Sequence, residues 1–149
     1  MLQAYFNSMR FVYHHQFLSS GLDLNDSTVG FLPAHAAALI SDEFSKRSYD
    51  GTSIRNVSDR PRNPSNASDS HELEAMRQFA ENPELKEHFT TITQSGKSYF
   101  FYASPIKIEP YCIQCHGKKE EVLPYIARRY DSAYGYSVGD IRGLTSIIM

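Results

Sequence analysis

Hydrophobic residues near the start of the chain recur at steps of three and four, the spacing of one helical face. They are Leu2, Tyr5, Phe6, Met9, Val12, Tyr13 and Phe17. The pattern predicts a long helix over about residues 2–19, which Gly21 would end. A shorter helix is predicted between Pro33 and Lys46, where an alanine-rich stripe repeats at similar steps.

A long polar segment separates these helices from the rest of the chain. Residues 49–70 are rich in Pro, Asn, Ser and Asp, which predicts a loop with one short strand at 53–57. Asp69 and Glu72 have the spacing of a capping box, in which each side chain bonds the backbone N–H of the other residue. A third helix is therefore predicted from this box to Asn82.

Two later segments are rich in Thr, Ile, Tyr and Phe, the residue types that favour strands. They cover residues 88–94 and 97–108, and Ser95-Gly96 between them supplies the turn of an antiparallel hairpin. An antiparallel sheet is therefore predicted alongside the helices.

The remaining segments complete an α+β pattern. A helix is predicted over about 120–130, despite Pro124, and a glycine-containing segment at 134–149 predicts a last strand. The 149 residues, of which 41% are hydrophobic, suffice for one core. We therefore expect a single α+β domain over residues 1–149, with an antiparallel sheet flanked by helices and a long N-terminal helix.

The charge balance excludes one class of partner. Lys and Arg number 15 against 17 Asp and Glu, for a formal net charge of −2. Binding to the phosphates of a nucleic acid needs a basic surface, so no nucleic-acid partner is expected. No stretch approaches the roughly 18 consecutive apolar residues of a membrane-spanning helix.

Both ends of the sequence look cut. The chain opens inside a helical pattern that Arg10 and His14 interrupt, so it lacks the unbroken apolar segment of a signal peptide. It closes on residues 145–149, which read as an unfinished strand. We expect a piece of a larger protein, whose flanking parts hold transmembrane segments or an export signal.

The two cysteines of the chain stand together in Cys112-Ile113-Gln114-Cys115-His116, a Cys-x-x-Cys-His signature typical of c-type haem attachment. Two thiols three residues apart can add to the two vinyl groups of one porphyrin, and the adjoining imidazole can bind the iron. The motif predicts covalently attached haem c, held by Cys112, Cys115 and His116. Because thioether attachment takes place outside the bacterial inner membrane, we expect a periplasmic or extracytoplasmic location.

Two other kinds of site use closely spaced cysteines. A structural zinc site needs four ligands, and no fourth ligand stands near Cys112, Cys115 and His116 in the sequence. A thioredoxin-like pair would open a helix directly after a strand, whereas Pro110 and Tyr111 precede the motif here. Haem attachment explains the spacing better than either alternative.

Several separate motifs, taken in order, resemble the family of c-type-haem-binding, PAS-like sensory domains of bacterial signal-transduction proteins. The resemblance covers essentially the whole chain and rests on Ser58-Asp59-Arg60-Pro61-Arg62-Asn63-Pro64-Ser65-Asn66, Asp69 with Glu72, the Cys-x-x-Cys-His-Gly segment, Tyr134-Gly135-Tyr136 and Gly139-Asp140-Ile141-Arg142-Gly143. It implies an antiparallel sheet flanked by helices, placed outside the inner membrane ahead of kinase, cyclase or chemoreceptor modules. The family usually carries a further proline where Ser68 stands here.

The loop before the third helix allows two interpretations. Haem propionates are anions, and the planar fork of an arginine suits carboxylates, so Arg62 or Arg55 is a candidate propionate clamp. In the other interpretation, the side chains of Asn63 and Asn66 and the rigid ring of Pro64 simply hold the loop in shape. Turn chemistry alone would explain these last three residues.

The iron face opposite His116 needs its own occupant, which decides between electron transfer and ligand binding. We expect His35 as the second iron ligand, because its alanine neighbours would let a flat porphyrin approach and the resembled family tends to place a distal residue there. His14 and His15 are the next candidates, split between two faces of the first helix. The remaining candidates are His71 and His88, expected to be solvated, and Met9 and Met76, expected in the core.

These features predict an extracytoplasmic sensor domain that detects redox state or a small diatomic ligand and signals to a membrane-linked output module. The alternative is a monohaem c-type cytochrome that carries electrons. The sequence shows no Ser-His-Asp arrangement and no phosphate-binding glycine loop, so we expect no enzymatic activity. The aromatic face of the first helix leaves two options open, packing within the domain or pairing with a second copy in a homodimer.

Overall fold

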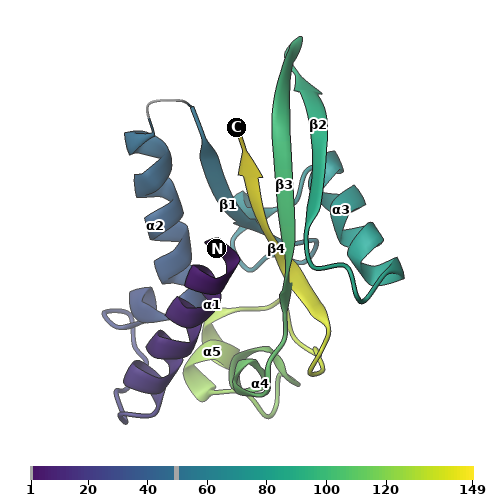
Figure 1. Cartoon of the computed structure of the whole chain (residues 1–149). Coiled ribbons are helices and arrows are strands. Elements are labelled where there is room, and N and C mark those ends of the chain that lie inside the picture. Colours follow the sequence, from purple (N-terminus) through teal and green to yellow (C-terminus); the bar gives the residue numbers. More distant parts are fainter. Residues whose placement is uncertain (1, 49–50) are drawn as a thin grey trace.

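Four antiparallel strands form one sheet, in the spatial order β1-β4-β3-β2 (Figure 1). The strands are β1 (Ser53–Val57), β2 (His88–Gln94), β3 (Lys97–Lys107) and β4 (Ile141–Ile148). The computed structural model describes residues 2–48 and 51–149. Strand β4, the last in the chain, lies between β1 and β3. The predicted α+β fold is confirmed.

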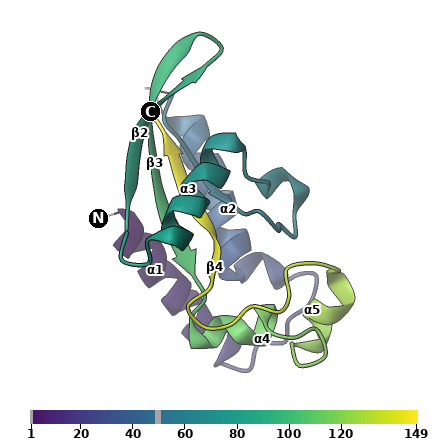
Figure 2. The same ribbon diagram turned by 90° about the vertical axis from the view of Figure 1, so that its right-hand side faces the viewer.

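Helices lie on both faces of this sheet and beside it. They are α1 (Leu2–Tyr13), α2 (Pro33–Arg47), α3 (Ser70–Glu81), α4 (Ile113–His116) and α5 (Pro124–Arg129), with the short helical turns η1 (His14–Leu18), η2 (Val29–Phe31), η3 (Pro64–Asn66) and η4 (Pro110–Cys112). Helix α1 covers one face, α3 packs on the opposite face, and α2 runs along the outer strand β1 (Figure 1, Figure 2). None of the described helices combines the length and the apolar character that a membrane span requires.

The side chains alternate along the strands, so both faces of the sheet bury apolar groups. The main core lies under α3 and comprises Val57, Ala75, Phe79, Ile92, Phe101, Ala103 and Leu144. On the other face, Ile54 and Ile147 pack with Met9 of α1 and with Tyr102. Helices α4 and α5 lie beyond one end of the sheet, at the same end as the C-terminus of α1 and the N-terminus of α2 (Figure 1).

Gly143 allows β4 to approach β1 closely. A Cβ atom at this position would lie 2.1 Å from the carbonyl oxygen of Val57. Only glycine fits here, because the obstacle is backbone and cannot move aside as a flexible side chain would. The last glycine of the Gly139–Gly143 stretch therefore serves the pairing of β1 with β4.

Most of the predicted elements are confirmed. The long first helix corresponds to α1 and the π-helical turn η1, and Gly21 follows with a φ of 73°. In the capping box, Glu72 N–H donates to Asp69 and Asp69 N–H donates to Glu72, both at 2.9 Å. Ser95 and Gly96 have φ values of 51° and 76°, as a two-residue hairpin turn requires.

Two details of the predicted helices are wrong. The helix expected over 120–130 begins only at Pro124, because a proline disfavours helical backbone at the residue before it, and Leu123 has a ψ of 132°. Val12 belongs to the predicted apolar stripe of the first helix, yet it is 54% exposed. Outside the described part of the structure lie the side chains of Leu2, Tyr5 and Phe6 and residues 49–50 of the predicted loop.

Candidate cofactor site

The Cys-x-x-Cys-His motif occupies two consecutive short helical turns. Cys112 closes η4, and Cys115 and His116 belong to α4. Pro110 starts η4, a position that suits its fixed φ and missing N–H. Because the cysteines stand three positions apart on a helical backbone, their side chains project to the same side. Both cysteines are free thiols.

The two thiols have different surroundings. Sγ of Cys112 accepts a hydrogen bond from the backbone N–H of Glu109 at 3.3 Å, and a guanidinium nitrogen of Arg10 lies 3.7 Å away. Burial raises the pKa of the Cys115 thiol to about 11. At neutral pH the Cys115 thiol is therefore protonated. Separately, the contact of Arg10 with Cys112 connects helix α1 to the motif.

The imidazole of His116 is oriented by one backbone carbonyl. Its Nδ1 donates to the carbonyl oxygen of Ala133 at 3.1 Å, which leaves the lone pair on Nε2. Burial first, and then the positive charges of Arg62 and Arg142, lower the pKa of His116 to about 3. The ring is thus neutral at pH 7, with the tautomer that a metal ligand bound through Nε2 requires. Tyr136 meets it edge-on, with ring centres 5.9 Å apart.

The segment after α5 holds the motif by backbone hydrogen bonds. Gly135 N–H donates to the carbonyl of Gly117 at 2.9 Å, and Tyr136 N–H donates to the carbonyl of His116 at 3.0 Å. Ala133 has a φ of 60°, a left-handed conformation that an L residue adopts only at a cost. The neighbouring turn thereby directs the Ala133 carbonyl at the His116 ring.

Arg62 joins the loop before α3 to this motif. Its guanidinium donates to the carbonyl oxygens of Cys115, Ser132 and Ala133, at 2.5, 3.2 and 3.3 Å. It also lies over the ring of Tyr130, 4.9 Å from the ring centre. Burial lowers the pKa of Arg62, although an arginine remains charged at any ordinary pH. The structure therefore brings Arg62 into the site, with its donors directed at backbone carbonyls.

Arg55, the other predicted clamp, makes its contacts on the α3 side of the sheet. It donates to the carbonyl of Ala67 at 3.0 Å and lies 3.9 Å from the carboxylate of Glu72. In the loop between β1 and α3, an asparagine side chain holds the backbone as the sequence predicts, since Asn63 Oδ1 accepts from the backbone N–H of Ser65 at 3.1 Å. Arg55 and Arg62 thus lie in different surroundings.

His35 lies in the first turn of α2 and is connected to the motif through Tyr130. Its Nε2 is hydrogen-bonded to the Tyr130 hydroxyl at 2.9 Å. The Tyr130 ring in turn lies under the guanidinium of Arg62, which bonds Cys115. Burial, followed by the charges of Arg129 and Arg62, lowers the pKa of the half-buried His35. His35 is therefore a neutral imidazole at pH 7 on the same end of the molecule as the motif.

His14 contacts the motif directly. Gln114, inside the Cys-x-x-Cys-His segment, donates from Nε2 to His14 Nδ1 at 3.1 Å. The His14 ring also stacks on Tyr111, with ring centres 4.5 Å apart. His15 packs on the exposed Phe11, and its ring also lies 5.5 Å from that of His14 in a T-shaped arrangement. The split of these two histidines between helix faces stays a prediction.

The four remaining iron-ligand candidates have no such connection. Met9 and Met76 pack against apolar clusters, as predicted. His71 and His88 are partly buried rather than fully solvated. Within residues 2–48 and 51–149, no hydrogen bond or ring contact joins any of the four to the motif, and no group of three or more His, Cys, Asp and Glu is arranged to hold a metal ion.

A family model described as Tll0287-like matches residues 1–149. The chain belongs to the Tll0287-like family. The crystal structure of the cyanobacterial heme-protein Tll0287 is similar to this one, with a TM-score of 0.76 and 23% sequence identity. The match covers 98% of this chain and 88% of that chain. No curated protein matches the sequence. The family resemblance drawn from the separate motifs is confirmed over the whole chain.

Sequence reasoning missed several residues of the site in this Tll0287-like protein. Arg10 approaches Cys112 from α1, and Tyr130 connects His35 to Arg62. These contacts join segments far apart in the chain, so no spacing of neighbouring residues in the sequence indicates them. Tyr136 and Arg142 both lie in motifs that carry the family resemblance. That position could have indicated them as site residues, but their residue types alone predict no role at the cysteines.

The contacts of Arg62 predict a structural contribution that lysine cannot replace. We expect Arg62→Lys to lower the free energy of unfolding of this Tll0287-like protein by about 2 kcal/mol, because an ammonium cannot satisfy three carbonyls and stack on a ring at once. Denaturant titration measures the change. Arg47→Lys is the matched control, since Arg47 is exposed and, among the described residues, forms its ion pair with Glu43. Equal stability of the Arg62 and Arg47 variants would contradict this role.

Proposed function

We propose that this protein binds haem c through thioether bonds to Cys112 and Cys115, with His116 as the proximal iron ligand. The observation that carries the proposal is the arrangement of the motif, in which two thiols lie one helical turn apart beside a neutral imidazole. The bond from His116 to Ala133 leaves Nε2 as the ligating nitrogen. Membership of the Tll0287-like family and the similarity to the crystal structure of a cyanobacterial heme-protein add support.

The electrostatic surroundings of His116 suit the anionic propionates of haem. Arg10, Arg62 and Arg142 all lie near enough to oppose its protonation. Within the described residues, none of these three arginines has a carboxylate partner within 4 Å. The site therefore keeps a positive field that an anionic group would compensate. When bound, haem supplies a redox-active iron with an axial position for a second ligand.

Covalent attachment is tested by maturing the protein with haem-ligation machinery and extracting it under denaturing conditions. We expect a mass increase of one haem that survives extraction, because thioether bonds do not dissociate. Cys112→Ala and Cys115→Ala should each leave a single thioether, with a shifted pyridine haemochrome band, and the double variant should retain no haem.

His71→Ala serves as the control, since His71 lies on α3 and should leave attachment unchanged. If the wild-type protein releases its haem on extraction, or retains none at all, covalent attachment is refuted and the zinc or thiol interpretations of the two cysteines return.

His35 is the proposed second axial ligand. Its imidazole is held neutral, and it is connected to the motif through Tyr130 and Arg62. In the structure Nε2 of His35 bonds the Tyr130 hydroxyl, so ligation through this nitrogen would exchange one partner for another. His14 is the rival, because Gln114 and Tyr111 already hold its ring against the motif.

The two histidines are separated by the spectra of the haem-loaded protein. We expect His35→Ala to convert low-spin bands to high-spin bands in at least one oxidation state, because a strong-field imidazole is lost. His14→Ala should leave the bands in place, as should His88→Ala, the control on β2. A spectrum altered by His14→Ala and unchanged by His35→Ala would exchange the two assignments.

The proposed role is an extracytoplasmic sensor of redox state or of a small diatomic ligand, linked to a membrane-bound output module. The bond between His35 and Tyr130 supports this role, because it gives the imidazole two alternative partners and hence two arrangements of α2. Arg10 and His14 join the motif to α1, so both helices that precede the sheet respond to the site. A monohaem electron carrier is the alternative, and it would need no exchange of partners.

Carbon monoxide distinguishes the sensor from the carrier. We expect the reduced, haem-loaded protein to bind carbon monoxide with a spectral shift, because His35 can leave the iron for Tyr130. His35→Ala should bind faster, since no ligand has to leave, and it also shows that the gas reaches the site. A wild-type protein that stays inert to carbon monoxide and exchanges electrons rapidly would favour the carrier.

A further inference from the structure

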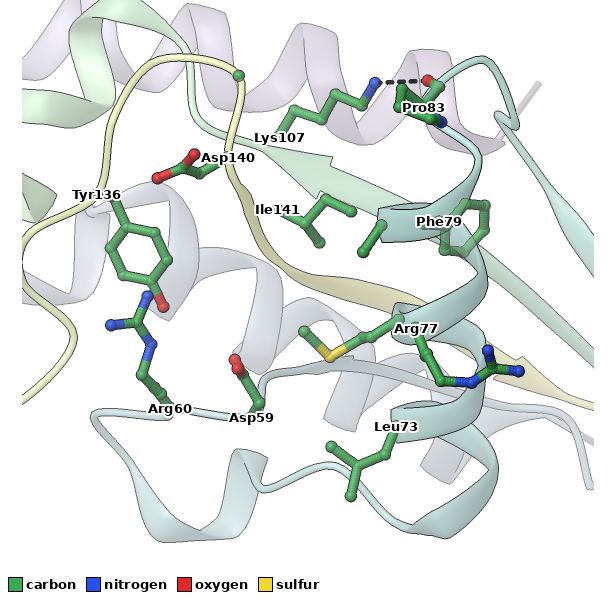
Figure 3. Close-up of a pocket in the computed structure, with 13 residues that line it drawn as sticks. Asp59, Arg60, Leu73, Arg77, Phe79, Pro83, Lys107, Tyr136, Asp140 and Ile141 are labelled. Carbon is green, nitrogen blue, oxygen red and sulfur yellow. Dashed lines mark hydrogen bonds between the residues drawn. The ribbon is translucent and has the colours of Figure 1, made fainter.

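A hollow of about 560 Å³ lies beside α3, and Tyr136 forms part of its wall (Figure 3). The same Tyr136 ring meets His116 edge-on. Neither cysteine of the motif lines the hollow. It is therefore a separate space that shares one aromatic side chain with the candidate cofactor site.

One wall of the hollow is apolar and belongs mainly to α3. Its side chains are Leu73, Met76, Phe79, Ala80, Pro83 and Ile141. Two cations on the rim are already engaged, because Arg77 pairs with Glu74 and Glu81, and Lys107 donates to the carbonyl of Pro83 at 3.1 Å (Figure 3). The apolar wall can accept a small hydrocarbon group. The charge of Arg77 is already compensated by two carboxylates, whereas Lys107 bonds a neutral carbonyl and keeps further donors.

The opposite wall carries polar groups, and Tyr136 is one of them. Tyr136 is only 4% exposed, and its hydroxyl, which lies near the Arg142 guanidinium, has no hydrogen bond of good geometry within the described part of the chain. A buried hydroxyl without a partner is unfavourable, and it points to a ligand that completes the site. The guanidinium of Arg60 lies over the Tyr136 ring, 4.2 Å from its centre, and that of Arg142 lies 5.5 Å from the same centre. No hydrogen bond from the Arg60 guanidinium is found within residues 2–48 and 51–149.

Two carboxylates share this wall. Asp59 accepts from the Ser58 hydroxyl at 3.2 Å, and Asp140 accepts from the backbone N–H of Ser137 at 2.8 Å, so both keep acceptor capacity. A simple anion bound at Arg60 would be repelled by these carboxylates, and a simple cation would be repelled by Arg60. A zwitterion avoids both conflicts because it offers one charge of each sign.

We propose that the hollow binds a free α-amino acid with an apolar side chain. Its carboxylate accepts hydrogen bonds from Arg60 and from the Tyr136 hydroxyl, and its ammonium donates to Asp59. Its side chain lies against the apolar wall next to Leu73 and Met76. Binding is therefore expected on the side of the Tyr136 ring that lines the hollow. The same ring contacts His116, so the bound amino acid would lie close to the motif.

Calorimetric titration of the full-length, haem-loaded protein tests the proposal without relying on the role of the haem. The probes are L-leucine, L-valine, L-methionine and L-phenylalanine, together with two analogues of leucine. The analogue 4-methylpentanoate lacks the ammonium, and 3-methylbutylamine lacks the carboxylate. We expect at least one amino acid to bind, and both analogues of leucine to bind about tenfold more weakly or worse than leucine, because each loses a charge-assisted hydrogen bond.

Variants of the polar wall locate the site. Tyr136→Phe keeps the ring and its packing, and we expect it, like Arg60→Gln and Asp59→Asn, to weaken amino-acid binding about tenfold. Arg77→Gln is the matched control on the rim and should leave affinity unchanged. The proposal is overturned if none of the four amino acids binds, if 4-methylpentanoate binds as tightly as leucine, or if Tyr136→Phe and Arg60→Gln both retain full affinity. Each of these outcomes leaves haem attachment untouched.

Discussion

The carbonyl oxygen of Ala133 is the point on which the candidate cofactor site depends. It accepts from both His116 and Arg62, and so it joins the motif, the loop before α3 and the segment after α5. The left-handed backbone of Ala133 costs about 1–2 kcal/mol, and the two hydrogen bonds that it permits offset this cost. The orientation of the His116 ring therefore depends on these three segments and not on the five-residue motif alone.

Positive charge around His116 follows from the same arrangement. The guanidinium of Arg62 donates to backbone carbonyls, which carry no net charge. These bonds therefore leave its positive charge uncompensated beside the His116 ring. Arg142 is likewise largely buried, bonded to the Ser58 hydroxyl at 2.5 Å. Burial first, and then this field, lower the pKa of His116, and the field would favour an anionic group over a second cation. Structural and electrostatic roles of Arg62 are thus compatible, and the two interpretations of this residue need not exclude each other.

Local chemistry made much of the fold predictable from sequence. The capping box at Asp69, the hairpin turn at Ser95-Gly96 and the spacing of the cysteines each depend on residues within five positions, and each has the expected geometry. The predicted start of α5 is wrong because Pro124 disfavours helical backbone at Leu123, a constraint that helical periodicity does not include. Contacts across about a hundred residues, such as the bond from Gln114 to His14, have no local signature, so the sequence ranks His14 and His35 without showing how each is held.

Tyr136 shows why the two sides of this domain are not independent. Its ring packs on His116, and Arg60 and Arg142 lie over it, while its hydroxyl has no hydrogen bond of good geometry among the residues that the structure describes. Any group that bonds this hydroxyl also sets the position of the ring, and the ring contacts the imidazole proposed to hold the iron. Protein interiors are close-packed, so a displaced ring moves its neighbours rather than leaving a void. A ligand bound beside α3 would therefore act on the same side chain as a change at the motif, which is the physical requirement for coupling two sites.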